Sequence, residues 1–231
     1  MRVTSNEKLI KQRRRYGTYS SLAGLGVLVI GMIASFQPNY LWVSMVAIVL
    51  GFALAQFGSY NLRRWGRSPR PDQVLANALK GFDDRYHLFA WALKAPFVLL
   101  TPHGIYSFVT RDQTGAISVE GSTWRSKRSL RRLLMLAAQE GLGNPSAEAM
   151  DLAERLEKWI REREPEGQTK VQPVVVFIDE RAQLTIKDPL VPVVDAKGLK
   201  KWLRGAGKGE NLPAEQMKRL EALFDAEVPQ L

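Results

Sequence analysis

A stretch of 47 residues without a charged side chain, residues 16–62, constrains this chain more than any other feature. It consists of two apolar blocks, residues 16–36 and 41–60, which are separated by Gln37, Pro38, Asn39 and Tyr40. Each block has about the 20 residues that a helix needs to cross the hydrocarbon core of a bilayer. We therefore expect a two-helix transmembrane hairpin. A cleaved signal peptide fits less well, because a second apolar block follows directly and no A-x-A site lies between them.

Basic residues flank this hairpin on both sides. Before it stand Lys8, Lys11, Arg13, Arg14 and Arg15, and after it stand Arg63, Arg64, Arg67 and Arg70. Loops rich in Lys and Arg stay in the cytoplasm, so we expect a two-span protein of the plasma membrane with both termini cytoplasmic. The spans contain no ionisable residue that would indicate a channel or pump. Small residues four positions apart, Ser20 with Gly24 and Gly51 with Ala55, predict close packing of the two helices.

The rest of the chain has a balanced charge. Of the 33 Lys and Arg residues and 23 acidic residues, ten basic residues and one acid lie in residues 1–70, which leaves 23 basic and 22 acidic residues in 71–231. The net charge of +10 therefore indicates a membrane flank before it indicates nucleic acid. The chain has no cysteine, and neither His87 nor His103 has an acid at a telling spacing, so the sequence predicts no metal site.

The residues after the hairpin predict a mixed α/β domain. Helical patterns cover about 72–82, 125–140, 145–163, 199–204 and 213–224, and strand patterns cover 88–91, 97–101, 105–110, 116–120, 171–178, 183–186 and 191–194. The strands within 94–120 are apolar enough to lie at the centre of the domain, buried on both faces. We expect a basic N-terminus (1–15), the hairpin (16–62), a basic linker (63–71) and a cytoplasmic α/β domain (72–231).

Several segments in this order resemble the nuclease-related domain (NERD) family. They are FVLLTPHGIYSFVTRDQTGAI, STW, GNPSAEAMDLAERLEKWI, VQPVVVFIDERAQLTI and VPVVDAKGLKKWLR, and they cover most of residues 71–231. The resemblance implies a restriction-endonuclease-like fold, a mixed sheet flanked by helices. The family often sits beside membrane spans, which the hairpin matches.

The family's nuclease pattern is an Asp before one strand and Glu-x-Lys on the next. Two carboxylates hold a divalent cation, and the lysine helps to activate water. Anchored on Gly104, these positions fall on Pro96, Val109 and Arg111, and none matches the pattern. The nearest acids are Asp112, read as a solvated turn residue, and Glu120. We therefore expect no catalytic residues, no metal and no cofactor, with Mg²⁺ relevant only to a rearranged site.

One basic cluster stands out in residues 71–231. It comprises Arg125, Lys127, Arg128, Arg131 and Arg132 at the start of the predicted helix 125–140. Three interpretations stay open: a solvated helix face, phosphate binding, and contact with anionic lipid or a protein. Our expectation is a membrane-anchored NERD-like protein that lacks nuclease activity and binds or scaffolds an unidentified protein at the cytoplasmic face. The alternatives are an active metal-dependent nuclease with a rearranged site and a membrane-tethered nucleic-acid-binding protein.

Overall fold

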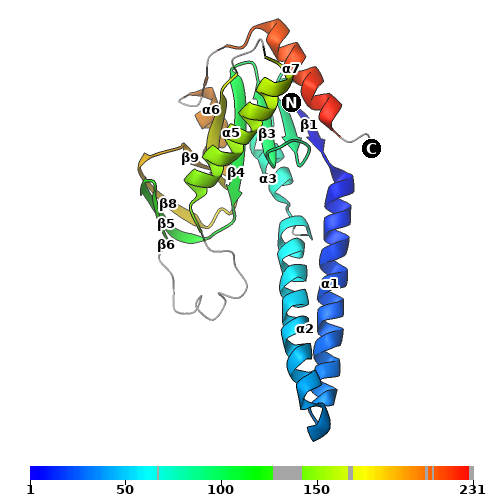
Figure 1. Cartoon of the computed structure of the whole chain (residues 1–231). Helices are drawn as coiled ribbons and strands as arrows, with labels where there is room; N and C mark the ends of the chain where they lie inside the picture. Colours follow the sequence, from blue (N-terminus) through cyan, green and yellow to red (C-terminus); the bar gives the residue numbers. More distant parts are fainter. Residues whose placement is uncertain (67, 127–141, 166–168, 206–207, 210, 229–231) are drawn as a thin grey trace. The chain divides into compact units, whose positions relative to one another are not determined.

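A computed structural model describes residues 1–66, 68–126, 142–165, 169–205, 208–209 and 211–228. The chain forms two compact units, one of residues 1–6 with 71–231 and the other of residues 7–70. The first unit is a mixed α/β domain and the second is a pair of long helices (Figure 1).

The elements follow one another in an order close to the predicted one. They are β1 (Arg2–Ser5), α1 (Glu7–Ala34), η1 (Pro38–Tyr40), α2 (Leu41–Asn61), η2 (Leu62–Gly66), α3 (Pro71–Ala78), β2 (His87–Ala90), β3 (Phe97–Thr101), β4 (Gly104–Arg111), β5 (Gly115–Gly121), β6 (Thr123–Ser126), α5 (Pro145–Arg163), β7 (Val171–Phe177), β8 (Ala182–Pro189), β9 (Val193–Asp195), α6 (Ala196–Arg204) and α7 (Ala214–Glu227). The prediction of a mixed α/β domain preceded by two apolar helices is confirmed.

The main sheet of the domain has six strands in the order β1-β2-β3-β4-β7-β9. Strands β2, β3 and β4 are antiparallel neighbours, whereas β1 pairs with β2, β4 with β7 and β7 with β9 in parallel. Strand β1 comes from the extreme N-terminal segment, which we had read only as a basic tail. The chain therefore contributes an edge strand to the domain before the first long helix begins.

Helices cover both faces of this sheet. On one face, Phe89, Val98 and Leu100 pack against apolar side chains of α5 and α7. On the other face, the side chains that alternate with these along the strands, among them Leu99 and Phe108, pack against α3 and α6. Because side chains alternate along a strand, central strands covered on both faces are apolar throughout. The prediction of doubly buried strands is confirmed for β3 and for most of β4.

A second sheet of three strands, in the order β6-β5-β8, corrects two predictions. Strand β5 belongs to this sheet and not to the central one. Its Ile117 and Val119 face the core, while Ser118 and Glu120 alternate with them and are more exposed. Thr123–Ser126 form β6, so the predicted helix does not begin at Arg125. A two-residue turn at Gly121 and Ser122, with φ 56° at Gly121, joins β5 to β6 as a hairpin and explains the difference.

In the second unit, α1 and α2 pack through small residues spaced seven apart. Gly17, Gly24 and Gly31 are the buried positions of the α1 span, and the buried positions of α2 include Ser44, Gly51 and Gly58. A methyl group added at Gly24 would lie 2.8 Å from backbone atoms of Gly51 and Ala55. Of the predicted pairs, Gly51 and Ala55 lie against Gly24 as expected, whereas Ser20 is not among the buried residues of α1, whose buried glycines repeat every seven residues. Arg70, the last residue of this unit, forms an ion pair of 2.7 Å with Glu7, its first residue.

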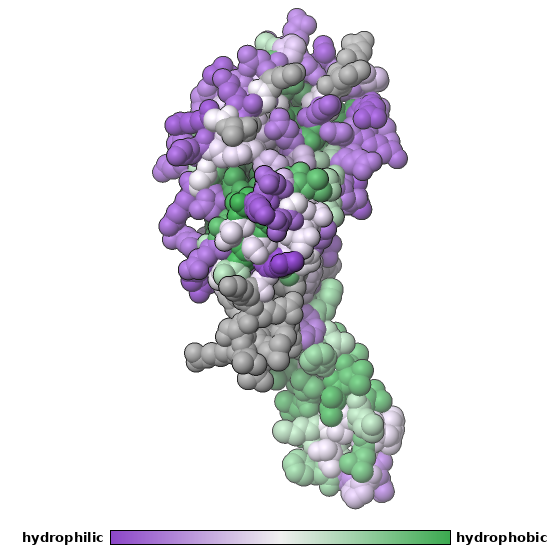
Figure 2. All heavy atoms as spheres, turned by 90° about the vertical axis from the view of Figure 1, so that its left-hand side faces the viewer, coloured by the Kyte–Doolittle hydropathy of each residue, from purple (hydrophilic) through white to green (hydrophobic). Residues whose placement is uncertain are grey.

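The outer surface of these helices is apolar (Figure 2). Large side chains such as Leu25, Ile30, Met45 and Val49 are 59–72% exposed. A water-soluble protein rarely exposes a continuous apolar surface of this extent. Both helices are long and apolar enough to cross a membrane, which is consistent with membrane association.

Candidate functional site

The three positions that the nuclease pattern would occupy lie together at one end of β3 and β4. Pro96 directly precedes β3, and Val109 and Arg111 are two apart on β4. The antiparallel pairing of Phe97 with Phe108 places Pro96 beside Val109. Residues two apart on a strand share a face, so Val109 and Arg111 point to the same side, that of α5. The fold therefore brings the three positions together.

Two of the three side chains, those of Val109 and Pro96, offer no ligand for a hard cation. Val109 is 3% exposed and packs with Ala149 of α5 and with Val175 of β7. Pro96 likewise carries no oxygen in its side chain. Divalent cations such as Mg²⁺ need several oxygen ligands, with carboxylates among them. Two of the three positions thus lack the atoms on which the chemistry depends.

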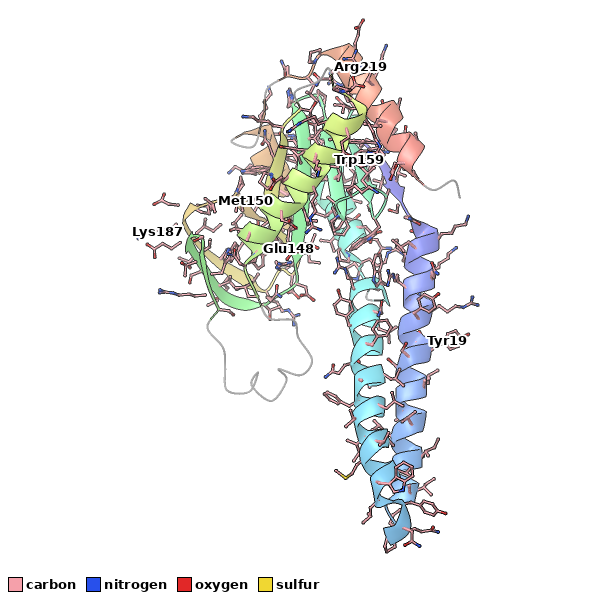
Figure 3. All side chains as sticks on the ribbon, viewed as in Figure 1. Tyr19, Glu148, Met150, Trp159, Lys187 and Arg219 are labelled. Atoms are coloured by element: carbon pink, nitrogen blue, oxygen red, sulfur yellow. The ribbon has the colours of Figure 1, made fainter. Side chains whose placement is uncertain are left out.

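Arg111, at the third position, forms an ion pair with Glu148. Its side chain is 14% exposed, and Nη2 lies 2.5 Å from Oε2 of Glu148. Glu148 lies in the first turn of α5, where the helix dipole favours an acid (Figure 3). Asn144 caps the same helix by accepting a hydrogen bond from Ala147 N. A guanidinium does not lose its proton in proteins, so Arg111 cannot act as a base. The pair neutralises charge at this end of the sheet.

The two acids nearest in sequence are Asp112 and Glu120. Asp112 is exposed just after β4 ends. Glu120 lies on the outer face of β5, and its Oε1 is 2.5 Å from Nζ of Lys187 on β8. Glu148, which the sequence reading did not select, is the acid that the fold brings to Arg111. It follows Arg111 by 37 residues and reaches it only because α5 packs across β4.

The outer face of the three-stranded sheet carries a shallow polar depression. It is lined by Ser118, Val119, Glu120, Thr123, Arg125, Thr185 and Lys187. Arg125 is thus the described member of the predicted basic cluster, and it projects from a strand and not from a helix. Lys127, Arg128, Arg131 and Arg132 lie outside the described residues. One acid, Glu120, and two cations, Arg125 and Lys187, line this depression, so its charge is mixed.

A different set of groups converges at the opposite end of the main sheet. His87 of β2 lies close to Glu221 and Asp225 of α7, and within the described ranges this is the one group of three side chains with the donor atoms of a metal site. His87 pairs with Leu100, whereas Ala90 pairs with Phe97 at the Pro96 end. Our interpretation of His87 as isolated is therefore wrong. The acids that face it come from a helix near the end of the chain, which spacing along the sequence does not reveal.

Burial controls the protonation of His87. Its side chain is 4% exposed. Desolvation and, to a smaller extent, the positive charge of Arg2 lower the pKa of His87 to about 4, against which the charge of Asp225 acts. The imidazole is consequently neutral at physiological pH, and its ring nitrogens are available as one donor and one acceptor.

No family model matches this chain, nor does any characterised protein or solved structure.

Proposed function

We propose that this chain is a membrane-anchored, NERD-like protein without nuclease activity, which works as a binding or scaffold module at the cytoplasmic face of the plasma membrane. The observation that carries the proposal is the end of β3 and β4. There Pro96, Val109 and Arg111 stand where the resemblance would require two carboxylates and a lysine. Metal-dependent hydrolysis needs those oxygens to hold the cation and orient water.

The ion pair of Arg111 with Glu148 supports the same conclusion. A divalent cation at this end of the sheet would meet the positive charge of Arg111, and the Glu148 carboxylate already accepts a hydrogen bond from that guanidinium. Recruiting Glu148 to a metal would take this ion pair from Arg111, a loss of about 0.5–1 kcal/mol because Glu148 is half exposed. Recruitment of Glu148 as a metal ligand is therefore disfavoured.

The course of the chain supports the proposed topology. The domain contains both residues 1–6 and residues 71–231, so the chain leaves it before α1 and returns to it after α2. Two crossings bring a chain back to the side on which it started. Basic residues flank both crossings, which favours the cytoplasm as that side.

The polar depression on the three-stranded sheet is the surface that we assign to partner binding. It lies on the sheet face opposite the core, and its lining offers hydroxyls of Ser118, Thr123 and Thr185 as well as charges of both signs. Such a lining suits a polar protein surface better than it suits a polyanion, which favours a uniformly basic patch. The near-neutral charge of residues 71–231 points the same way.

A cleavage assay on the full chain in lipid nanodiscs tests the proposal. The full chain is needed because β1 belongs to the domain. We expect no cleavage of single- or double-stranded DNA or RNA with Mg²⁺ or Mn²⁺ above a protein-free control. Metal-dependent cleavage that is lost in Asp112→Ala, Glu120→Ala or Glu148→Ala would show that a rearranged site is active.

The same preparation separates the binding module from a nucleic-acid tether. We expect no salt-dependent shift of DNA or RNA mobility, and the same result for Arg125→Glu. A shift that weakens with salt and is lost in Arg125→Glu would favour the tether. Lys201→Glu on α6 is a matched control, because it removes an equal charge from a surface away from the depression.

A further inference from the structure

We propose that His87, Glu221 and Asp225 form a binding site for a divalent transition-metal ion, with Arg2 as a competing cation. The three side chains each offer one donor atom, and these atoms lie within 4.8 Å of one another. Glu221 and Asp225 are four residues apart on α7 and therefore share one helix face. The site is independent of the proposed function, because it lies at the other end of the main sheet from Arg111.

The hydrogen bonding of His87 prepares one nitrogen for a metal. Nε2 lies 2.8 Å from the hydroxyl oxygen of Thr4 on β1, and Nδ1 has no hydrogen-bond partner among the residues that the structure describes. If Nε2 donates its proton to Thr4, the lone pair of Nδ1 points toward the carboxylates. Metal-bound histidines are commonly oriented in this way by a second group on the far nitrogen. The ring of Phe89, 3.9 Å away between centroids, also restricts the imidazole.

The contact between His87 and Glu221 depends on the tautomer of the imidazole. Nδ1 lies 3.7 Å from Oε1 of Glu221. In the tautomer that carries its proton on Nε2 and donates it to Thr4, both Nδ1 and Oε1 are acceptors, and a metal ion among the three side chains satisfies both at once.

The charges at this place also favour a divalent ion. Glu221 and Asp225 together carry two negative charges, while the guanidinium of Arg2, which contacts Glu221, supplies one positive charge. The Arg2 side chain is 46% exposed, so it can turn toward solvent when another cation arrives. One imidazole and two carboxylates are ligands that suit Zn²⁺, with a position left for water. Zn²⁺ is therefore the probe we choose.

Zn²⁺ binding to the full chain in nanodiscs, without a histidine tag, tests the site. Competition with a chromophoric chelator gives the affinity, and Co²⁺ gives an absorption spectrum that reports the coordination geometry. We expect one Zn²⁺ per chain. His87→Gln and Asp225→Asn should each weaken binding at least about tenfold, the smallest loss seen when even an outer-shell partner is removed. Arg2→Gln should tighten binding, because it removes the competing cation.

His103→Gln is the matched control, because it removes the other histidine of the chain. It should leave the affinity unchanged. Asp225 is exposed, so Asp225→Asn tests the site without disturbing the core even if His87→Gln proves unstable. The proposal is overturned if Zn²⁺ does not bind, if Asp225→Asn leaves the affinity unchanged, if Arg2→Gln weakens binding, or if His103→Gln abolishes it.

Discussion

The two units of this protein bury and expose opposite kinds of residue. The α/β domain encloses large side chains such as Phe89, Phe97 and Phe108, each at most 1% exposed. The helical pair buries glycine, alanine and serine between its helices and turns its large apolar side chains outward. A domain surrounded by water gains free energy by hiding large apolar side chains, whereas helices surrounded by lipid gain it from close backbone contact. The contrast is consistent with water around the domain and lipid around the helical pair.

Removing a large side chain should therefore lower the stability of the domain strongly and that of the helical pair very little. Phe108→Ala should lower the free energy of unfolding of the domain by about 4 kcal/mol, because it opens a cavity between the main sheet and the helices α3 and α6. Leu25→Ala is the matched control on α1, where the side chain is 59% exposed. It should change stability by less than about 0.5 kcal/mol. Guanidinium unfolding in detergent, followed by tryptophan fluorescence, measures both, and equal losses would contradict the contrast.

Acidification should destabilise the domain and leave the helical pair unaffected. The pKa of His87 is about 4 in the folded protein and about 6.5 when unfolded, with Arg2, Glu221 and Asp225 as its charged neighbours. Above pH 6.5 both states are neutral and His87 has no effect. Below it the unfolded chain binds a proton that the folded chain does not, so stability falls by about 3 kcal/mol by pH 4.

The histidine variants assign this pH dependence. In His87→Gln the loss of stability between pH 6.5 and 4 should shrink by that amount, whereas His103→Gln should keep it. Denaturant unfolding at a series of pH values measures the difference. An unchanged slope in His87→Gln would mean that other groups cause the acid sensitivity.

Adding a single methyl group should distinguish the buried glycines of the helical pair from its outward ones. Gly24→Ala should cost about 2 kcal/mol, because the new Cβ would lie 2.8 Å from backbone atoms of α2 that cannot move aside. Gly26→Ala, two residues along the same helix, meets nothing within 4 Å and should be neutral or slightly stabilising. Unfolding in mixed detergent micelles compares them. Equal effects would show that the seven-residue spacing does not form the helix contact.

Breaking the ion pair at the end of β4 should have the smallest effect. Glu148 is 49% exposed, so Glu148→Gln should destabilise the domain by about 0.5–1 kcal/mol. Glu154→Gln on the exposed side of the same helix is the control. Thermal unfolding with and without Mg²⁺ at about 1 mM adds a second readout, because a genuine Mg²⁺ site is occupied at about this concentration. Stabilisation by Mg²⁺ that disappears in Glu148→Gln would place a metal at this end of the sheet after all.

The sequence predicted the elements better than their partners. The uncharged stretch 16–62 located both long helices, and apolar runs located β3, β4 and β7, because burial on every side leaves a local signature. The helix predicted at 199–204 is α6, and the carboxylate of Asp195 caps it by accepting a hydrogen bond of 2.8 Å from Gly198 N. Such features depend on neighbours within a few residues.

Pairings between distant segments were missed. Arg2–Ser5 contain too few residues to show a strand pattern, and their partner β2 follows more than eighty residues later. The same holds for His87 with Glu221, and for Arg111 with Glu148. For β6 a local signal did exist, the two-residue turn at Gly121 and Ser122, but the arginines that follow it favoured a helix.

The most direct test of the account is the side of the membrane on which each unit's residues lie. Because the chain has no cysteine, single substitutions at Val3, Asn39 and Ser122 can each be probed with a membrane-impermeant maleimide. In intact cells we expect labelling of Asn39→Cys alone, with Val3→Cys and Ser122→Cys labelled only after the membrane is opened. Labelling of Ser122→Cys in intact cells, or labelling of all three sites without opening the membrane, would contradict a cytoplasmic domain anchored by two spans.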